Sequence, residues 1–192
     1  MKKLFFYLIG FVILASQSSC GYNTMVQKDE TVESQWANVQ NAYQRRADLV
    51  PNLVNTVKGA ADFERGTLTD VIEARAKATS VNISPDNLTP ENIQRFQQAQ
   101  GELSGALSRL LVSVERYPEL KANQNFLELQ AQLEGTENRI SVERRKFNEA
   151  LQDYNSYIRS FPRNLVAGMF DFEKKGYFEA EASAQQAPTV EF

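Results

Sequence analysis

The sequence predicts an all-α protein, an antiparallel up-and-down bundle of four long helices. Three observations support this class. The 192 residues include only nine Gly and six Pro, so that long stretches contain no residue that breaks a helix. Apolar residues recur at spacings of three and four along most of the chain, which is the repeat of one helix face. With 42% hydrophobic residues, the chain has enough apolar material for the core of one domain.

The amino terminus has the pattern of an export signal. Two lysines follow the initiating methionine, residues 4–15 are an apolar run, and two serines directly precede Cys20. This order is typical of a secretory signal, and small residues before a cysteine are typical of the bacterial lipobox, in which the cysteine is acylated. We therefore expect residues 1–19 to be a signal peptide, residues 20–23 to be the anchor region and Cys20 to carry the lipid.

An uncleaved hydrophobic anchor is the alternative. Gln17 stands where the lipobox usually has an aliphatic residue, which favours this alternative. The apolar run, however, is shorter than the roughly 20 residues of a membrane-spanning helix. Under either interpretation the chain is attached to a membrane at one end, through Cys20 or through the hydrophobic segment, and residues 21–192 lie outside the cytoplasm.

The first helix is expected to begin between Tyr22 and Thr31 and to end before Gly59. Its apolar seam consists of Trp36, Val39, Tyr43, Val50, Leu53 and Val57. Pro51 interrupts the seam, because proline lacks an N–H group and crowds the carbonyl four residues before it. The apolar phase is the same on both sides of Pro51, so the sequence predicts one helix kinked there rather than two helices. Trp36 lies in phase with the seam, which favours core packing over a role at the membrane interface.

Two further helices are separated by a loop at 80–90. The first of them carries Phe63, Leu68, Val71 and Ile72 and runs to the region of Thr79. The second is expected to start at Thr89-Pro90, where threonine can cap the free amide groups and proline can occupy the first helical position. Its seam consists of Ile93, Phe96, Leu103, Leu107, Leu110, Val114 and Tyr117, and Pro118 ends it.

The fourth helix is predicted to be the longest. Its apolar stripe consists of Phe126, Leu129, Leu133, Ile140, Phe147, Leu151, Tyr154 and Ile158, and no proline occurs before Pro162. Beyond Pro162, aromatic residues set among glycines predict an apolar strap folded back on the bundle, which completes a bundle region at 24–178. Residues 179–192 are small, polar or acidic and carry no core pattern, so we expect a disordered tail.

Two absences restrict the chemistry. The sequence has no His, and its single Cys lies in the processing signal. Catalytic triads with His, His-containing zinc sites and haem or di-iron sites with His ligands all need residues that this chain lacks. A net charge of −3 without a basic stripe is unsuited to nucleic-acid binding. We therefore expect no catalytic residues, no metal, no cofactor and no nucleic-acid partner.

Three charged residues fall on the predicted seams. Heptad spacing puts Arg46 on the seam of the first helix, and it puts Glu137 and Arg144 on that of the fourth. A lone buried ion is costly, so charges at such positions are normally paired. Because the first and fourth helices of an up-and-down bundle are antiparallel neighbours, we expect a buried Arg46–Glu137 ion pair, with Arg144 as a further polar seam position. This pair either fixes the register of the helices or belongs to a ligand or partner site.

Several sequence blocks together resemble the LemA family. They are Gly21-Tyr22-Asn23, Trp36, Gln44-Arg45-Arg46-Ala47-Asp48-Leu49-Val50-Pro51-Asn52-Leu53-Val54, Val57-Lys58-Gly59, Glu73-Ala74-Arg75-Ala76, Tyr117-Pro118-Glu119-Leu120-Lys121-Ala122-Asn123, Phe126, Leu129-Gln130, Glu137-Asn138-Arg139-Ile140, Phe147-Asn148 and Tyr154-Asn155. The resemblance implies a four-helix bundle outside the cytoplasm on an amino-terminal membrane attachment, and it implies no enzyme activity. Many members keep a transmembrane helix at the attachment, whereas Cys20 here implies a lipid.

The function expected from these observations is an interaction or scaffolding module of the bacterial cell envelope, with envelope proteins as its partners. Two other functions stay open. One is a lipid-binding or membrane-remodelling bundle. The other is a hydrolase that uses carboxylates such as Glu73, Glu115 or Glu137, which would need two carboxylates close together in a cleft. The sequence does not distinguish attachment to the inner membrane from attachment to the outer membrane.

Overall fold

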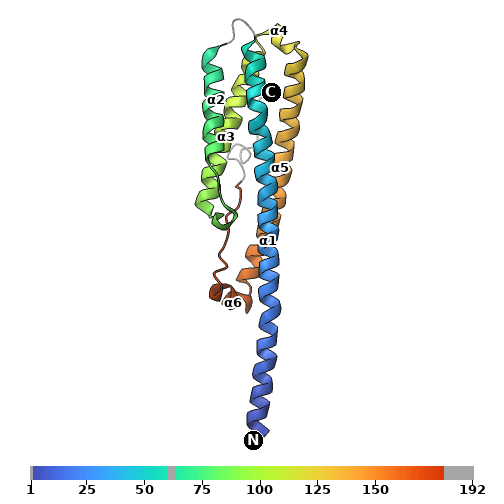
Figure 1. The fold of residues 1–192 in the computed structure, drawn as a ribbon, viewed down its shortest axis with the longest axis vertical. Coiled ribbons are helices and arrows are strands. Elements are labelled where there is room, and N and C mark those ends of the chain that lie inside the picture. The colour runs from blue at the N-terminus through green and yellow to red at the C-terminus, as the bar shows by residue number, and fades with distance from the viewer. Residues whose placement is uncertain (1, 60–63, 180–192) are drawn as a thin grey trace, which may run out of the picture. The chain divides into compact units, whose positions relative to one another are not determined.

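The computed structural model describes the backbone of residues 2–59 and 64–179, and side chains from residue 21 onward. Within these residues the chain forms six α-helices, one 3-10 turn and no strand, which confirms the predicted all-α class. The elements are α1 (Lys2–Lys58), α2 (Arg65–Ser80), η1 (Pro85–Asn87), α3 (Pro90–Val114), α4 (Pro118–Lys121), α5 (Gln124–Arg159) and α6 (Arg163–Met169) (Figure 1). None of the described helices has a stretch that is both long and apolar enough to cross a membrane.

The chain divides into two compact units. Unit 1 comprises Met1–Ala42 and Ile140–Lys175, and unit 2 comprises Tyr43–Arg139 and Gly176–Phe192. Helices α1 and α5 therefore contribute residues to both units. Each unit has buried apolar side chains of its own, and each is described separately below.

Helix α1 differs from its prediction at the start and agrees with it at the end. It begins at Lys2 rather than between Tyr22 and Thr31, because no proline precedes Pro51 and isolated glycines weaken a helix without ending it. The helix continues through Pro51 as a single element and ends at Lys58, directly before Gly59. The prediction of one helix rather than two is therefore confirmed.

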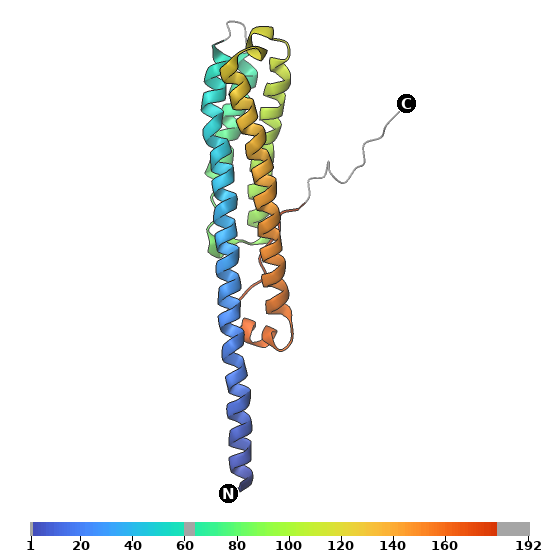
Figure 2. The ribbon, with the colours of Figure 1, turned by 90° about the vertical axis from the view of Figure 1, so that its right-hand side faces the viewer.

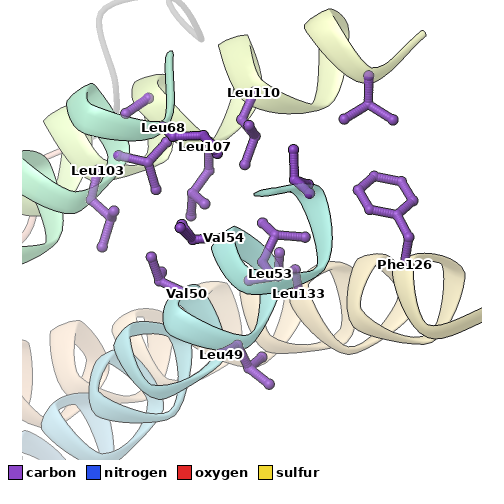
Figure 3. Packing of buried hydrophobic residues seen from close by; sticks show 14 of the residues in the cluster. Leu49, Val50, Leu53, Val54, Leu68, Leu103, Leu107, Leu110, Phe126 and Leu133 are labelled. Carbon is purple, nitrogen blue, oxygen red and sulfur yellow. The ribbon is translucent and has the colours of Figure 1, made fainter. Parts of the chain in front are cut away.

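The core of unit 2 combines side chains from α1, α2, α3, α4 and α5. Its members are Leu49, Val50, Leu53, Val54, Val57, Leu68, Val71, Ala78, Leu103, Ala106, Leu107, Leu110, Val114, Leu120, Phe126 and Leu133. Figure 3 shows labelled members from α1, α2, α3 and α5 pointing into the space that these helices enclose. Fully burying a side chain of this size contributes about 1.5–3 kcal/mol to folding, so this core is the main stabilising element of unit 2.

In unit 1, α1 and α5 share a second set of buried residues. They are Met25, Val32, Trp36 and Val39 from α1, and Phe147, Leu151, Tyr154 and Ile158 from α5. The rings of Trp36 and Phe147 lie with their centroids 5.4 Å apart. Trp36 is fully buried, which confirms its prediction as a core residue.

The start of α3 follows its sequence signature. The Thr89 hydroxyl oxygen accepts a hydrogen bond from the Asn92 amide at 3.3 Å, and Pro90 is the first residue of the helix. At the other end, α3 stops at Val114 and Pro118 begins the short helix α4. The side-chain oxygen of Asn123 then caps α5 by accepting hydrogen bonds from the backbone amides of Asn125 and Phe126.

Helix α5 is a single element of 36 residues, as its unbroken apolar stripe predicts. The prediction that it is the longest helix is wrong, because α1 starts at Lys2 and has 57 residues. The segment after Pro162 is not the continuous strap that was expected, because Arg163–Met169 forms helix α6. Residues 163–169 contain no proline and consist largely of good helix formers, so one or two turns of helix are compatible with them. The extended strap is confined to 172–179.

Candidate functional site

Arg46 is the most deeply buried charged residue in the described part of the chain. Its side chain is 1% exposed, although it lies on α1 among the apolar residues of unit 2. An arginine is almost never fully buried unless partners satisfy its five N–H donors. Its surroundings therefore define the candidate site.

Three residues accept hydrogen bonds from the Arg46 guanidinium. Nη1 donates to Ser104 Oγ at 2.6 Å and to Glu137 Oε1 at 2.7 Å. Nη2 donates to the backbone oxygen and to Oε1 of Gln100, at 3.0 and 2.7 Å. The ring of Tyr43 lies 5.1 Å from the guanidinium carbon, within the range of a cation–π contact. Arg46 on α1 is thereby tied to α3 and α5.

Gln100 extends this cluster to α2. Its side chain is buried, and its Nε2 donates to the Ala78 carbonyl oxygen at 3.2 Å. Ala78 belongs to the last turn of α2, where carbonyl groups lack partners within the helix. The side-chain amide of Gln100 thus donates to a carbonyl at the end of α2 and accepts a hydrogen bond from Arg46. The cluster therefore joins four helices, α1, α2, α3 and α5.

One donor of the cluster has no acceptor among the described residues. Arg46 Nε is buried and makes no hydrogen bond to any of their atoms. An unmade hydrogen bond of this kind costs about 1–3 kcal/mol. Both Nη atoms of Arg46 thus have hydrogen-bond acceptors, whereas its Nε has none among the described residues.

The structure brings Arg46 and Glu137 together, but only the arginine is buried. The Glu137 side chain is 45% exposed, and the seam position between Leu133 and Ile140 is held by Thr136, which is 4% exposed. Because a helix turns by 3.6 residues, either the third or the fourth residue after a seam position can face the core. Glu137 therefore reaches Arg46 from the edge of the core.

The same difference of one residue occurs at the next seam position, in unit 1. Arg144 was predicted there, whereas Glu143 is the residue that is 3% exposed and Arg144 is half-buried. Lys146 Nζ lies 3.3 Å from both carboxylate oxygens of Glu143. The ionisable residue buried at this seam position of α5 is thus a glutamate rather than an arginine.

A second arginine contact of unit 2 was not predicted. Arg75 Nε on α2 donates to the backbone oxygen of Ala47 at 2.7 Å. In an α-helix this carbonyl would accept from the amide four residues later, which is position 51, and Pro51 has no amide hydrogen. The Arg75 guanidinium supplies the missing donor. The only sequence signal for this pairing is that Pro51 must leave the Ala47 carbonyl free.

The strap is held by side-chain amides in each unit. In unit 1, Asn155 Nδ2 donates to the Lys175 carbonyl at 3.0 Å, and its Oδ1 accepts from the Lys175 amide at 3.1 Å. In unit 2, Gln97 makes the same paired contact with the Glu179 backbone, at 3.0 and 3.2 Å. Each amide side chain pairs with the extended strap as a neighbouring β-strand would. Asn155 is 3% exposed, so its contact is a buried one.

Tyr154 belongs to the same part of unit 1. Its hydroxyl donates to the Glu173 carbonyl at 3.1 Å. Burial, and then the carboxylates of Asp29 and Glu173, raise the pKa of Tyr154 above its ordinary value. Asp29 itself forms an ion pair with Lys175. The tyrosine is therefore a neutral hydrogen-bond donor that fixes the strap.

The carboxylates considered for catalysis have separate surroundings. Glu137 binds Arg46, Glu115 forms an ion pair with Lys121, and Glu73 is exposed on α2. In the portion of the chain with described side chains, no group of three or more Cys, Asp or Glu residues is arranged to hold a metal ion. The chemistry available at the candidate site is thus that of a buried cation bound by neutral and acidic acceptors.

Three other predictions concern regions that the structure does not describe in full. The predicted signal peptide at 1–19 and Cys20 are described by backbone alone, except Met1, which is not described. Lipidation of Cys20 therefore stays a prediction. The predicted disordered tail lies outside the described residues from position 180 onward.

Comparison with known proteins gives a consistent family. The model of the LemA family matches residues 35–192. Magnetosome protein MamQ 2 of Paramagnetospirillum magneticum is 25% identical over 186 residues, which cover 88% of this chain and 68% of that protein. Protein LemA of Metamycoplasma hominis is 22% identical over 180 residues, which cover 92% and 78%. MamQ of Magnetospirillum gryphiswaldense is 24% identical, with coverages of 88% and 68%. Because the family model spans most of the sequence, including every residue of the Arg46 cluster, the chain belongs to the LemA family.

Proposed function

We propose that this protein is a membrane-anchored, extracytoplasmic helical bundle that acts as an interaction or scaffolding module of the bacterial cell envelope, without enzymatic activity. In this proposal α1, α2, α3 and α5 form an antiparallel four-helix bundle, and the attachment is the acylated Cys20 or the apolar run before it. The partners are other envelope proteins.

The observation that carries the proposal is that both Nη atoms of Arg46 are bound by acceptors within the chain. Arg46, the one charged residue buried among the described residues of unit 2, makes four hydrogen bonds to Gln100, Ser104 and Glu137 of the same chain. A group used in this way joins helices and is not presented to a substrate.

The attachment can be tested by metabolic labelling with a clickable fatty acid. We expect the wild-type chain to incorporate the label and to sediment with membranes, and Cys20→Ser to lose the label. Equal labelling of both chains would contradict acylation at Cys20. Recovery of the wild-type chain in the soluble fraction would contradict membrane attachment by either route.

The scaffolding role can be tested by photo-crosslinking in living cells. Ile72 on α2 and Val112 on α3 are exposed apolar residues of unit 2, at 52% and 71%, and each can be replaced by a photoreactive amino acid without disturbing the core. We expect at least one position to give a discrete crosslinked envelope protein, while the buried position Leu107 gives none. A scan of exposed helix positions that yields no adduct would contradict the role.

A further inference from the structure

Large exposed apolar side chains gather on α6 and in the residues on either side of it. Phe161, Leu165, Met169 and Phe170 are 82, 61, 77 and 55% exposed, and we refer to them as the α6 apolar surface. They make up half of the large apolar side chains that are exposed in the described part of the chain, yet they lie within ten residues of sequence. A cluster of this kind is typical of a contact surface, whereas single exposed apolar residues need no explanation.

Helix α6 has the reverse of the usual distribution of side chains. Leu165 and Met169 are four residues apart and therefore share one face, while Ala167 is on the opposite face. Ala167 is the buried residue of this helix, at 4%. A helix in contact with water normally buries its large apolar residues and exposes its small or polar ones. The outward face of α6 is suited to an apolar environment.

This surface lies next to the membrane attachment. The ring of Tyr22 on α1 contacts the rings of Phe170 and Phe172, at centroid distances of 4.8 and 5.8 Å. All three residues belong to unit 1, and both ribbon views show α6 beside α1 (Figures 1 and 2). Tyr22 follows Cys20 by two residues, about 3 Å along a helix at 1.5 Å per residue. The α6 apolar surface therefore adjoins the part of α1 that follows directly after the predicted acylation site.

The exposed charged side chains between positions 159 and 174 are of both signs, with three cations and two carboxylates. Arg159, Arg163 and Lys174 are exposed, against the exposed carboxylates of Asp171 and Glu173. The Arg163 guanidinium lies over the Tyr157 ring, 4.2 Å from its centroid. Basic side chains around exposed Phe and Leu residues are the composition of helices that lie in the headgroup region of a membrane.

We propose that the α6 apolar surface inserts into the headgroup–acyl boundary of the membrane to which the chain is anchored, so that the protein is held at two adjacent points. This inference rests on the proposed membrane attachment. A second copy of the chain is the competing occupant. A stable protein interface buries about 800 Å² on each partner, and four side chains around one short helix offer a small area by that measure.

Tryptophan quenching by brominated lipids tests the insertion directly. The acylated full chain is isolated as wild type, Phe161→Trp and Val112→Trp, and each is reconstituted into vesicles of phosphatidylcholine and phosphatidylglycerol with and without bromine in the acyl chains. Trp36 is fully buried, so the wild-type chain gives the background. We expect the added emission of Phe161→Trp to be blue-shifted and quenched several-fold more strongly than that of Val112→Trp, the matched exposed control.

A second variant removes the surface without touching the core. Adding Leu165→Ser and Met169→Ser to the Phe161→Trp chain replaces two exposed side chains, so the helix content in circular dichroism should stay unchanged. Quenching should then fall to the level of Val112→Trp while the chain still floats with the vesicles.

Flotation of the vesicles separates the two proposals. If the chains float but the probes at positions 161 and 112 are quenched equally, the inserted surface is refuted and the anchor stands. If the chains do not float, the anchor is refuted and the insertion with it. If the blue shift at position 161 appears without vesicles and grows with protein concentration, the occupant is a second copy and the membrane proposal is overturned.

Discussion

At the scale of single residues, Arg46 has the largest number of described polar contacts, and its pairing with Glu137 can be measured. Arg46→Met should destabilise the protein by about 1–3 kcal/mol, because the buried acceptors of Gln100 lose their donor. Glu137→Leu should cost less, since its carboxylate is 45% exposed and surface pairs contribute about 0–1 kcal/mol. Urea unfolding of both single variants and the double variant gives the coupling energy. A double variant equal to the sum of the single variants would refute the pairing.

Gly176 is required by a close backbone approach. Its amide donates to the Leu88 carbonyl at 2.8 Å, and a Cβ at this position would lie 2.6 Å from Pro90 Cα. Gly176→Ala should therefore lower the free energy of unfolding by about 1–3 kcal/mol, the usual cost of overpacking. Gly101→Ala is the matched control, because nothing lies within 4 Å of its added Cβ and alanine stabilises a helix by about 0.5–1 kcal/mol relative to glycine. Thermal unfolding should move in opposite directions for the two variants.

At the scale of elements, α1 and α2 are linked by the carbonyl that Pro51 leaves free. In the wild-type chain Arg75 donates to Ala47, and Arg75→Met should cost about 1–3 kcal/mol by leaving a buried carbonyl unpaired. In a Pro51→Ala background the new amide hydrogen can pair with Ala47, so the same replacement should cost clearly less. Chemical denaturation of the four chains measures the difference. An Arg75→Met cost that does not depend on residue 51 would show that the arginine acts by another contact.

The strap illustrates how an extended element is fixed by helices. Asn155 and Gln97 each use one amide to bind both the N–H and the C=O of a strap residue. A segment without regular structure must find partners for its backbone groups wherever it is buried. These two side chains provide them, and Gly176 allows the strap to lie against the start of α3.

At the scale of the whole molecule, the raised pKa of Tyr154 links global stability to pH. The unfolded tyrosine ionises near its ordinary value of 10, whereas the folded one does so only at higher pH. The folded state therefore retains a proton that the unfolded state loses, and stability that is fully present below pH 10 is lost progressively above it. Stability measured from pH 8 to 11 should fall less steeply for Tyr154→Phe than for wild type. Parallel curves for the two chains would contradict the shift.

Much of the architecture could be predicted from the sequence, because helix formation depends on local pattern. The scarcity of glycine and proline and the spacing of apolar residues indicated the helical class, the passage of α1 through Pro51, the Thr89–Pro90 start of α3 and the length of α5. The composition by itself restricted the chemistry, since a chain without His cannot form His-based sites. The proximity of Arg46 to Glu137 was also accessible, because both lie near the seams of helices expected to be neighbours.

The tertiary structure alone decided which residues complete these contacts. Seam spacing cannot separate positions one residue apart, so Thr136 and Glu143 are buried where Glu137 and Arg144 were expected. The partners of Arg46 and of the Ala47 carbonyl come from helices distant in sequence, and the outward face of α6 is defined by what packs behind Ala167. Periodicity is a property of one helix, whereas the exposure and pairing of a side chain depend on neighbours that only the folded chain brings together.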